Sequence, residues 1–184
     1  MFKKMFTRFS KVVAAGLVLS FMFLVPGAEA SHWGLSGGLQ THDPTIVRES
    51  GNTWWSASTG TGIGMKYSTN GGKTWTDGLP IFSRPLSWWK KYAPNMTTND
   101  VWAPDLEYYR GRYYCYYSVS EFGKNNSAIG LVSCSSISKG DWRDDGVVLY
   151  SRYGSSKFNA IDPNLVVDAK GKPWLVYGSW FDGI

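Results

Sequence analysis

Thr41-His42-Asp43-Pro44 begins a pattern that returns as Trp102-Ala103-Pro104-Asp105 and again as Ala160-Ile161-Asp162-Pro163. The three prolines are 60 and 59 residues apart, and each unit begins a short apolar run. A glycine ends each run, at positions 51, 111 and 171, and an aromatic-rich stretch follows each glycine. Self-similarity at a long, fixed period is typical of propellers and solenoids.

Each repeat has the composition of antiparallel strands. Runs of β-branched and aromatic residues bounded by Gly and Asn predict hairpins. The predicted strands are 45–48, 53–58 and 63–68 in the first repeat, 106–109, 113–118 and 128–134 in the second, and 165–167 and 174–177 in the third. A turn at 69–75 leads to a fourth strand in the first repeat. We therefore predict an all-β chain in which one repeat supplies one propeller blade of about four strands.

The length of the chain fits an incomplete array of such blades. Its 184 residues contain two full repeats and part of a third, and the sequence ends at Phe181-Asp182-Gly183-Ile184, directly after a strand-like run. We expect an N-terminal fragment that holds about the first two blades and part of the third. Open propeller sectors leave strand edges uncovered, so residues 31–184 alone are expected to fold poorly.

Residues 1–30 have the three regions of a secretory signal peptide. Basic residues come first, an apolar run spans 12–25, and Ala28-Glu29-Ala30 has the small-x-small form of a cleavage site. The apolar run is short for a membrane span, so export is favoured over an uncleaved anchor. We expect a secreted protein whose mature domain is 31–184 and which has no membrane association after cleavage.

The charge of the chain is concentrated in this leader. Four basic residues and one acidic residue of 1–30 account for three of the five formal positive charges. The mature part therefore has no basic block that would indicate nucleic acid or an anionic membrane as a partner. Cys115 and Cys134 both lie in the second repeat. An exported protein can oxidise them, but packed free thiols fit equally well, and no spacing indicates zinc.

Two insertions interrupt the repeat plan, at 84–94 and 119–126. They are too polar or too rich in proline for core strands, and the first holds Trp88, Trp89 and Tyr92. We expect exposed aromatic loops at one rim of the propeller, where they suit stacking against sugar rings.

Asp43 and Asp162 occupy equivalent positions at the start of two blades, each directly before a proline. In a propeller the first strand of each blade lines the central channel, so the two carboxylates are expected to face one cavity. Paired carboxylates can divide general acid and base work, as glycoside hydrolysis requires. Asp before Pro is also common in turns, where it caps backbone N–H groups, and the repeat alone leaves both interpretations open.

The sequence also resembles the endo-1,5-α-L-arabinanases of glycoside hydrolase family 43. The motifs that carry the resemblance are 41–44, 101–105, 116–125, 127–130, 159–163 and 177–180. The resemblance implies a five-bladed β-propeller that cleaves α-1,5-linked arabinan with inversion and works as a monomer. By resemblance, Asp43 matches the general base, and Asp162 matches a carboxylate that orients the acid and raises its pKa. Trp102, Phe122, Asn159 and Ser179 match positions at the sugar subsites or the channel mouth.

The resemblance also implies a general acid, a glutamate that opens the next blade, and one further period beyond Asp162 falls past the last residue. The glutamates within 31–184 are Glu49, Glu107 and Glu121, which we expect to be surface or hydrogen-bonded residues: Glu49 in a hairpin turn and Glu121 in a loop. The fragment alone is therefore expected to be inactive.

The chemistry needs no cofactor. The family's channel calcium lies near a late histidine, and the two histidines here, His32 and His42, do not supply that ligand. We predict no metal ligand in this chain and possible structural calcium in a full-length channel. Two alternatives stay open: a non-catalytic carbohydrate-binding propeller, and an exo-acting arabinofuranosidase or β-xylosidase of the same family.

Overall fold

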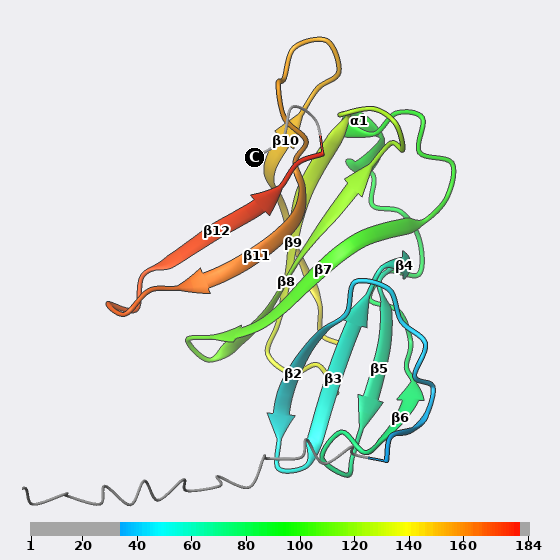
Figure 1. The fold of residues 1–184 in the computed structure, drawn as a ribbon, viewed down its shortest axis with the longest axis vertical. Helices are drawn as coiled ribbons and strands as arrows, with labels where there is room; N and C mark the ends of the chain where they lie inside the picture. The colour runs from blue at the N-terminus through cyan, green and yellow to red at the C-terminus, as the bar shows by residue number, and fades with distance from the viewer. Residues whose placement is uncertain (1–33, 181–184) are drawn as a thin grey trace, which may run out of the picture. The chain divides into compact units, whose positions relative to one another are not determined.

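The computed structural model describes residues 34–180, and nearly all of their regular secondary structure is β-strand (Figure 1). Three sheets follow one another along the chain, with five, five and two strands. The first long strand of each sheet begins within five residues of one of the three repeated units. The prediction of an all-β chain with one blade per repeat is confirmed.

The first blade contains four antiparallel strands in chain order. These are β2 (Thr45–Ser50), β3 (Thr53–Ser58), β5 (Gly64–Ser68) and β6 (Thr74–Asp77), with the short β1 (Ser36–Gly37) parallel to β6 at the edge. The predicted turn before β6 is built by side chains: Asn70 Oδ1 accepts from the Thr74 N–H at 2.9 Å, and the Ser68 hydroxyl accepts from the Gly72 N–H at 3.0 Å. The hairpins form where the local sequence predicts them.

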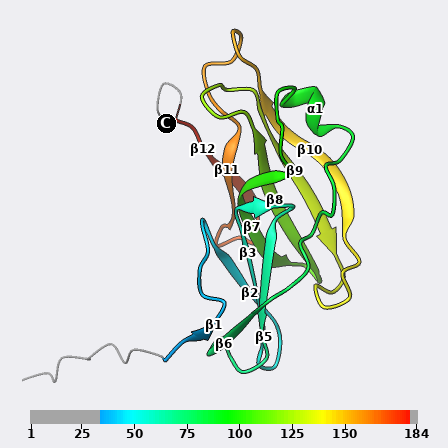
Figure 2. The ribbon, with the colours of Figure 1, turned by 90° about the vertical axis from the view of Figure 1, so that its right-hand side faces the viewer.

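The second blade repeats this plan with longer strands. It consists of β7 (Asp100–Tyr109), β8 (Arg112–Ser120), β9 (Ser127–Cys134) and β10 (Arg143–Ser151). Figure 2 shows β10 on the side of this blade away from β11. The short β4 (Gly60–Thr61), which follows the first blade's β3, pairs with β7 and so joins the two blades. The third sheet is the hairpin of β11 (Ile161–Val167) and β12 (Pro173–Gly178).

The first strands of the three blades, β2, β7 and β11, are neighbours. Side-chain acceptors link them: the Leu106 N–H donates to Thr45 Oγ1 at 3.2 Å, and the Leu165 N–H donates to Asp105 Oδ2 at 2.6 Å. Thr45 and Asp105 are equivalent, because each lies two residues after the repeated Asp or Ala. The repeat therefore encodes the contact between blades as well as the blade itself.

The apolar core lies mainly within the second blade and between it and the first. Leu106, Tyr117 and Val119 are fully buried there. Cys115 and Cys134 are both buried and both free, which decides the question that the sequence leaves open. Burial raises the pKa of each thiol, and for Cys134 the value reaches about 12. Both side chains therefore act as small apolar residues of the core.

The aromatic insertion differs from the prediction. Residues 89–92 form a single helical turn, α1 (Trp89–Tyr92), and Trp89 is 0% exposed. Its ring lies edge-on to Phe82, with 5.1 Å between centroids, and close to Tyr117. Trp89 is therefore a core residue, because the large apolar ring gains more from burial than from a place at the rim. The second insertion was also placed wrongly at its start, because β8 continues to Ser120.

The predicted signal peptide, residues 1–30, lies outside the described residues. Among residues 34–180, no helix has the length and apolar character that a membrane crossing requires.

Candidate active site

The three repeated units share an unusual backbone conformation. Asp43, Ala103 and Asp162 have φ angles of 48°, 40° and 51°. Few residues other than glycine adopt positive φ, and a following proline normally favours extended backbone, so the conformation is strained. In the second and third blades the hairpin register shifts at this point, between Trp102 and Asp105 and between Ile161 and Asn164. In these two blades the repeat thus builds a bulge that interrupts the ladder at the repeated position.

The three repeated units meet at one open cavity of about 460 Å³. Its lining consists of the repeated units and the residues that follow them: 43–46, 103–105, Glu107 and 162–164. Asp43 and Asp162 are therefore brought together, as the period predicts, with Ala103 between them in chain order. The second blade leaves a methyl group where the other two present carboxylates.

Asp43 is held through one of its two oxygens. Oδ2 accepts from the Thr59 hydroxyl at 2.7 Å and lies 2.6 Å from His42 Nδ1. Within residues 34–180, no hydrogen bond reaches the other oxygen, Oδ1. The side chain of Asp43 is 44% exposed, so water has access to it. A carboxylate anchored on one oxygen and free on the other is suited to accept a proton from a water molecule.

Asp162 has a different environment. Its backbone N–H donates to the Ser118 hydroxyl at 3.0 Å, and no described residue makes a hydrogen bond to its carboxylate. Burial, reinforced by the negative charge of Asp43, raises the pKa of Asp162 above its ordinary value. Gly178 makes room for it, because an added Cβ there would lie 3.1 Å from Asp162 Oδ2. Two carboxylates in unlike environments are typical of a division of acid–base roles.

Aromatic side chains border Asp162. A second cavity, of about 420 Å³, is lined by Trp102, Phe122, Gly123, Ile161, Asp162 and Trp180. Phe122 is 95% exposed and Trp180 is 50% exposed. The two aromatic positions expected near the sugar therefore lie beside the carboxylate. Trp180 was not among the predicted site residues, although it ends one of the motifs that carry the resemblance.

Asn159 and Ser179 contact each other and line none of the cavities described above. The Asn159 N–H donates to Ser179 Oγ at 2.9 Å, and Asn159 is 0% exposed. Their place in substrate binding stays a prediction.

The three glutamates have distinct environments. Glu49 is the penultimate residue of β2, not part of the turn, and its carboxylate accepts hydrogen bonds from Trp55, Ser136 and Ser138. The expectation of a turn position was wrong because the strand continues to Ser50. The hydrogen bonds themselves fit the expectation of a structural residue.

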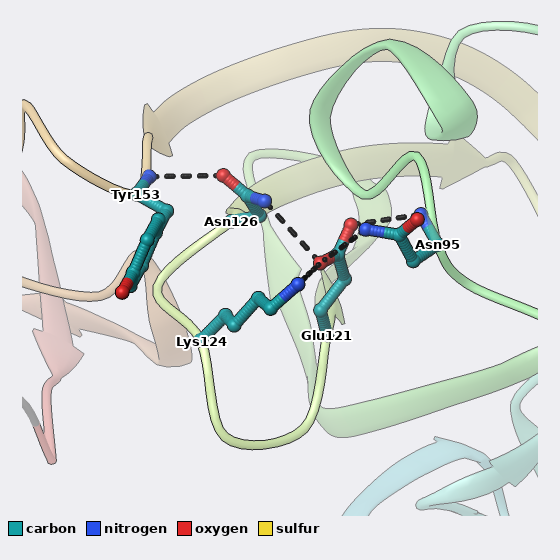
Figure 3. A network of polar contacts seen from close by, with 5 residues as sticks. All are labelled: Asn95, Glu121, Lys124, Asn126 and Tyr153. Atoms are coloured by element: carbon teal, nitrogen blue, oxygen red, sulfur yellow. Dashed lines mark hydrogen bonds and ion pairs between the residues drawn. The ribbon is translucent and has the colours of Figure 1, made fainter.

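Glu121 is 6% exposed and lies at the centre of a polar network (Figure 3). It accepts from the N–H and the side chain of Asn95, at 2.8 and 3.0 Å, and from Asn126 Nδ2 at 3.2 Å, with Lys124 Nζ at 4.0 Å. Asn126 Oδ1 in turn accepts from the Tyr153 N–H. The network ties three loops together next to Phe122, so Glu121 has a structural role.

Glu107 lines the central cavity, and burial, with the charge of Asp105 second, raises the pKa of its carboxyl. It lies within β7, four residues beyond Ala103, and not at the blade start where the repeat places Asp43 and Asp162. That Glu107 is not the general acid stays a prediction.

Metal binding finds no support in this part of the chain. Among residues 34–180, no three His, Cys, Asp or Glu side chains are grouped so that they could hold an ion. The nitrogen of His42 that faces Asp43 is used in their hydrogen bond. The described residues therefore do not fit a channel metal.

The fold and the site together define a class: a β-propeller with carboxylates at its channel, of the glycoside hydrolase type. The model of the family "Glycosyl hydrolases family 43" matches residues 38–183. The chain belongs to this family, whose arabinanases are five-bladed β-propellers, and it has the fold of about half of one.

Individual relatives agree with this assignment. The chain is 47% identical to the extracellular endo-α-(1→5)-L-arabinanase 1 of Bacillus subtilis, over 99% of this chain and 56% of the relative. The structure of an endo-arabinanase from Bacillus licheniformis superposes with a TM-score of 0.76 and 51% identity, covering 81% of this chain and 51% of that one. An α-L-arabinanase from Cellvibrio cellulosa, in complex with arabinohexaose, gives a TM-score of 0.72 at 35% identity, covering 78% and 46%. The chain spans about half the length of the relatives it matches.

Proposed function

We propose that the whole protein is a secreted hydrolase that cleaves the α-1,5 linkages of L-arabinan within the polymer. The observation that carries this is the convergence of Asp43 and Asp162 on one cavity beside Trp102 and Phe122. Relatives named endo-arabinanases, with 47% and 51% identity, support the substrate and the cleavage mode. The name of the Bacillus subtilis relative and the residue pattern of 1–30 support secretion.

Asp43 serves as the general base in this proposal. Its free Oδ1 takes a proton from a water molecule, which attacks the anomeric carbon from the face opposite the leaving oxygen, so the configuration inverts. Asp162, close enough to Asp43 to be affected by its charge, orients the acid and raises its pKa by like-charge repulsion. Glu49 and Glu121 are held in structural hydrogen bonds, and Glu107 lies within β7 and not at a blade start, so we place the acid on a glutamate outside this chain. This chain alone is then inactive.

Trp102 and Phe122 bind the sugar in the proposal, because apolar ring faces stack on the C–H surfaces of sugars. Asn159 and Ser179 stay candidates that shape the wall of the site through their mutual hydrogen bond. The whole protein is proposed to act as a monomer on arabinan, without a cofactor; calcium, if bound, belongs to a part of the channel beyond these residues.

The test is hydrolysis of linear α-1,5-arabinan by the product of the complete gene. Short oligosaccharides of mixed length, released initially as the β-anomer in proton NMR spectra, are expected. Release of single sugars or dimers alone would indicate an exo-acting enzyme. Binding of arabinan without any hydrolysis would favour a carbohydrate-binding propeller.

A further inference from the structure

Thr59 connects the first blade's carboxylate to the backbone of the second blade. Its Oγ1 accepts from the Ala103 N–H at 2.7 Å and lies 2.7 Å from Asp43 Oδ2. A hydroxyl has one proton to donate, and a backbone N–H can only donate. Because Ala103 occupies the acceptor side of the hydroxyl, the proton of Thr59 is directed to Asp43.

The geometry holds both ends of this link in place. The bulge between Trp102 and Asp105 interrupts the β7–β8 register around Ala103, where the Ala103 N–H meets Thr59. The N–H of Thr59 itself donates to the His42 carbonyl at 2.9 Å. The hydroxyl is therefore fixed by its own blade and by the next one.

The equivalent positions in the other blades lack this contact. In the second blade the position equivalent to Thr59 is Ser118. Its hydroxyl accepts from the Asp162 N–H at 3.0 Å, but the repeated position of that blade is Ala103, which has no carboxylate to receive a hydrogen bond. In the third blade the equivalent position is Gly178, which has no hydroxyl. A Cβ added there would come close to the Asp162 side chain. Among the described blades, a hydroxyl donates to the carboxylate of its own blade only at Asp43.

We propose that Thr59 is a positioning residue, which anchors Oδ2 of Asp43 so that Oδ1 stays directed to water. The inference rests on the proposed role of Asp43 as the base. Without Thr59, Oδ2 keeps only the contact with His42 Nδ1, whose side chain is 77% exposed, so the carboxylate is freer to rotate about its last torsion, which is broad for Asp. The attacking water would then meet the base in the wrong orientation in most encounters, while the sugar contacts at Trp102 and Phe122 would be unchanged.

Kinetics of the complete gene product test this role. Thr59→Val keeps the shape and removes the hydroxyl, so kcat on arabinan is expected to fall about tenfold or more while KM stays within about twofold, since misplacement of a reacting group affects the chemical step. Thr59→Ser should restore most of kcat. Thr61→Val is the matched control: Thr61 lies two residues after Thr59, and its hydroxyl donates to Asp100 instead of Asp43, so both constants should stay unchanged. An unchanged kcat in Thr59→Val, or an equal loss in Thr59→Ser, would overturn the proposal.

Crystal structures of the wild type and Thr59→Val separate this inference from the proposed function. The Asp43 carboxylate is expected to rotate or become disordered in Thr59→Val, with the backbone of both blades unchanged. If the wild type hydrolyses no arabinan, the proposed function fails, and the structures still decide whether Thr59 positions Asp43. A carboxylate that keeps its position without the hydroxyl rejects the positioning role whatever the activity.

Discussion

Ala103 shares the backbone conformation of Asp43 and Asp162 but has no carboxylate. Its φ of 40° matches Asp43 and Asp162, although alanine tolerates this region less well than aspartate. The bulge is therefore a property of the repeat rather than of the side chain. The pattern of the sequence reveals the equivalence of the three positions, but not the strain, because the pre-proline position predicts extended backbone.

Ala103→Gly tests whether this strain costs stability. Glycine adopts positive φ without a Cβ penalty, so the substitution is expected to raise the free energy of unfolding of the complete gene product by about 1 kcal/mol. Denaturant titration measures the change. Ala57→Gly is the control, because Ala57 lies in the regular part of β3, where glycine is unfavourable. This substitution should lower the free energy of unfolding by roughly 0.5–1 kcal/mol. Loss of stability in Ala103→Gly would show that the conformation is not strained.

The pKa of Asp162 depends on burial and, second, on the charge of Asp43. Burial and the charge of Asp43 both raise this pKa, so removing the charge with Asp43→Asn should lower it. Carboxyl carbon-13 NMR titration of the complete gene product measures the shift. Glu107→Gln is the control, because Glu107 lines the same cavity without being a source of the shift, and should leave the titration of Asp162 unchanged. An unchanged pKa in Asp43→Asn would mean that the two carboxylates do not interact.

At the scale of elements, Glu49 joins the first blade to the second. It lies near the end of β2, and its carboxylate accepts from the Ser136 hydroxyl at 2.7 Å and from the Ser138 N–H at 3.0 Å, between β9 and β10. Burial alone would raise its pKa, but hydrogen bonds from Ser138, Ser136 and Trp55 outweigh burial and lower it. The ionised form therefore stabilises the junction.

Glu49→Gln should lower the free energy of unfolding at pH 7 by about 1 kcal/mol, as expected for a partly exposed charged hydrogen-bonding group. The wild-type carboxylate has a lower pKa when folded than when unfolded, so its advantage is full above its ordinary pKa of 4.5 and is lost as pH falls through the folded value. The difference between the two proteins should shrink on acidification, measured by denaturant titration at several pH values.

For Glu107→Gln we expect the pH dependence of stability to run in the opposite direction. The pKa of Glu107 is raised, so the wild-type carboxylate disfavours the folded state once pH rises above the unfolded value. The variant should gain stability relative to the wild type as pH increases. If the free energies of unfolding of the wild type and Glu49→Gln differ by the same amount at every pH, the ionised carboxylate of Glu49 does not stabilise the junction between the blades.

The elements differ in how far the sequence predicts them. The hairpins of the first two blades follow from adjacent β-branched runs and Gly turns, so local patterns suffice. The burial of Trp89 depends on Phe82 and Tyr117, and the partners of Glu49 lie 87 and 89 residues away, so composition alone indicates neither. The period predicts that Asp43 and Asp162 share one cavity, and they do. It does not predict the contact of Thr59 with Asp43 or the place of Trp180 beside Asp162, which depend on how the chain folds in three dimensions.

At the scale of the whole molecule, the period brings the same position of each described blade to one cavity. The residue at this position varies as Asp, Ala and Asp. Two acidic residues away from this position, Glu49 and Glu121, each contact several partners and hold blades or loops together. Unequal substitution of one repeated position is enough to give a symmetric fold an asymmetric site.

The most direct measurement of the central claim compares initial rates on linear α-1,5-arabinan for the complete gene product and its Asp43→Asn variant. Loss of the base should reduce kcat by a factor of about 100 or more, because general base catalysis contributes roughly 10²- to 10⁴-fold, with thermal unfolding unchanged. A variant that hydrolyses arabinan at the wild-type rate would contradict the assignment of Asp43 as the base and, with it, the account of the cavity as the active site.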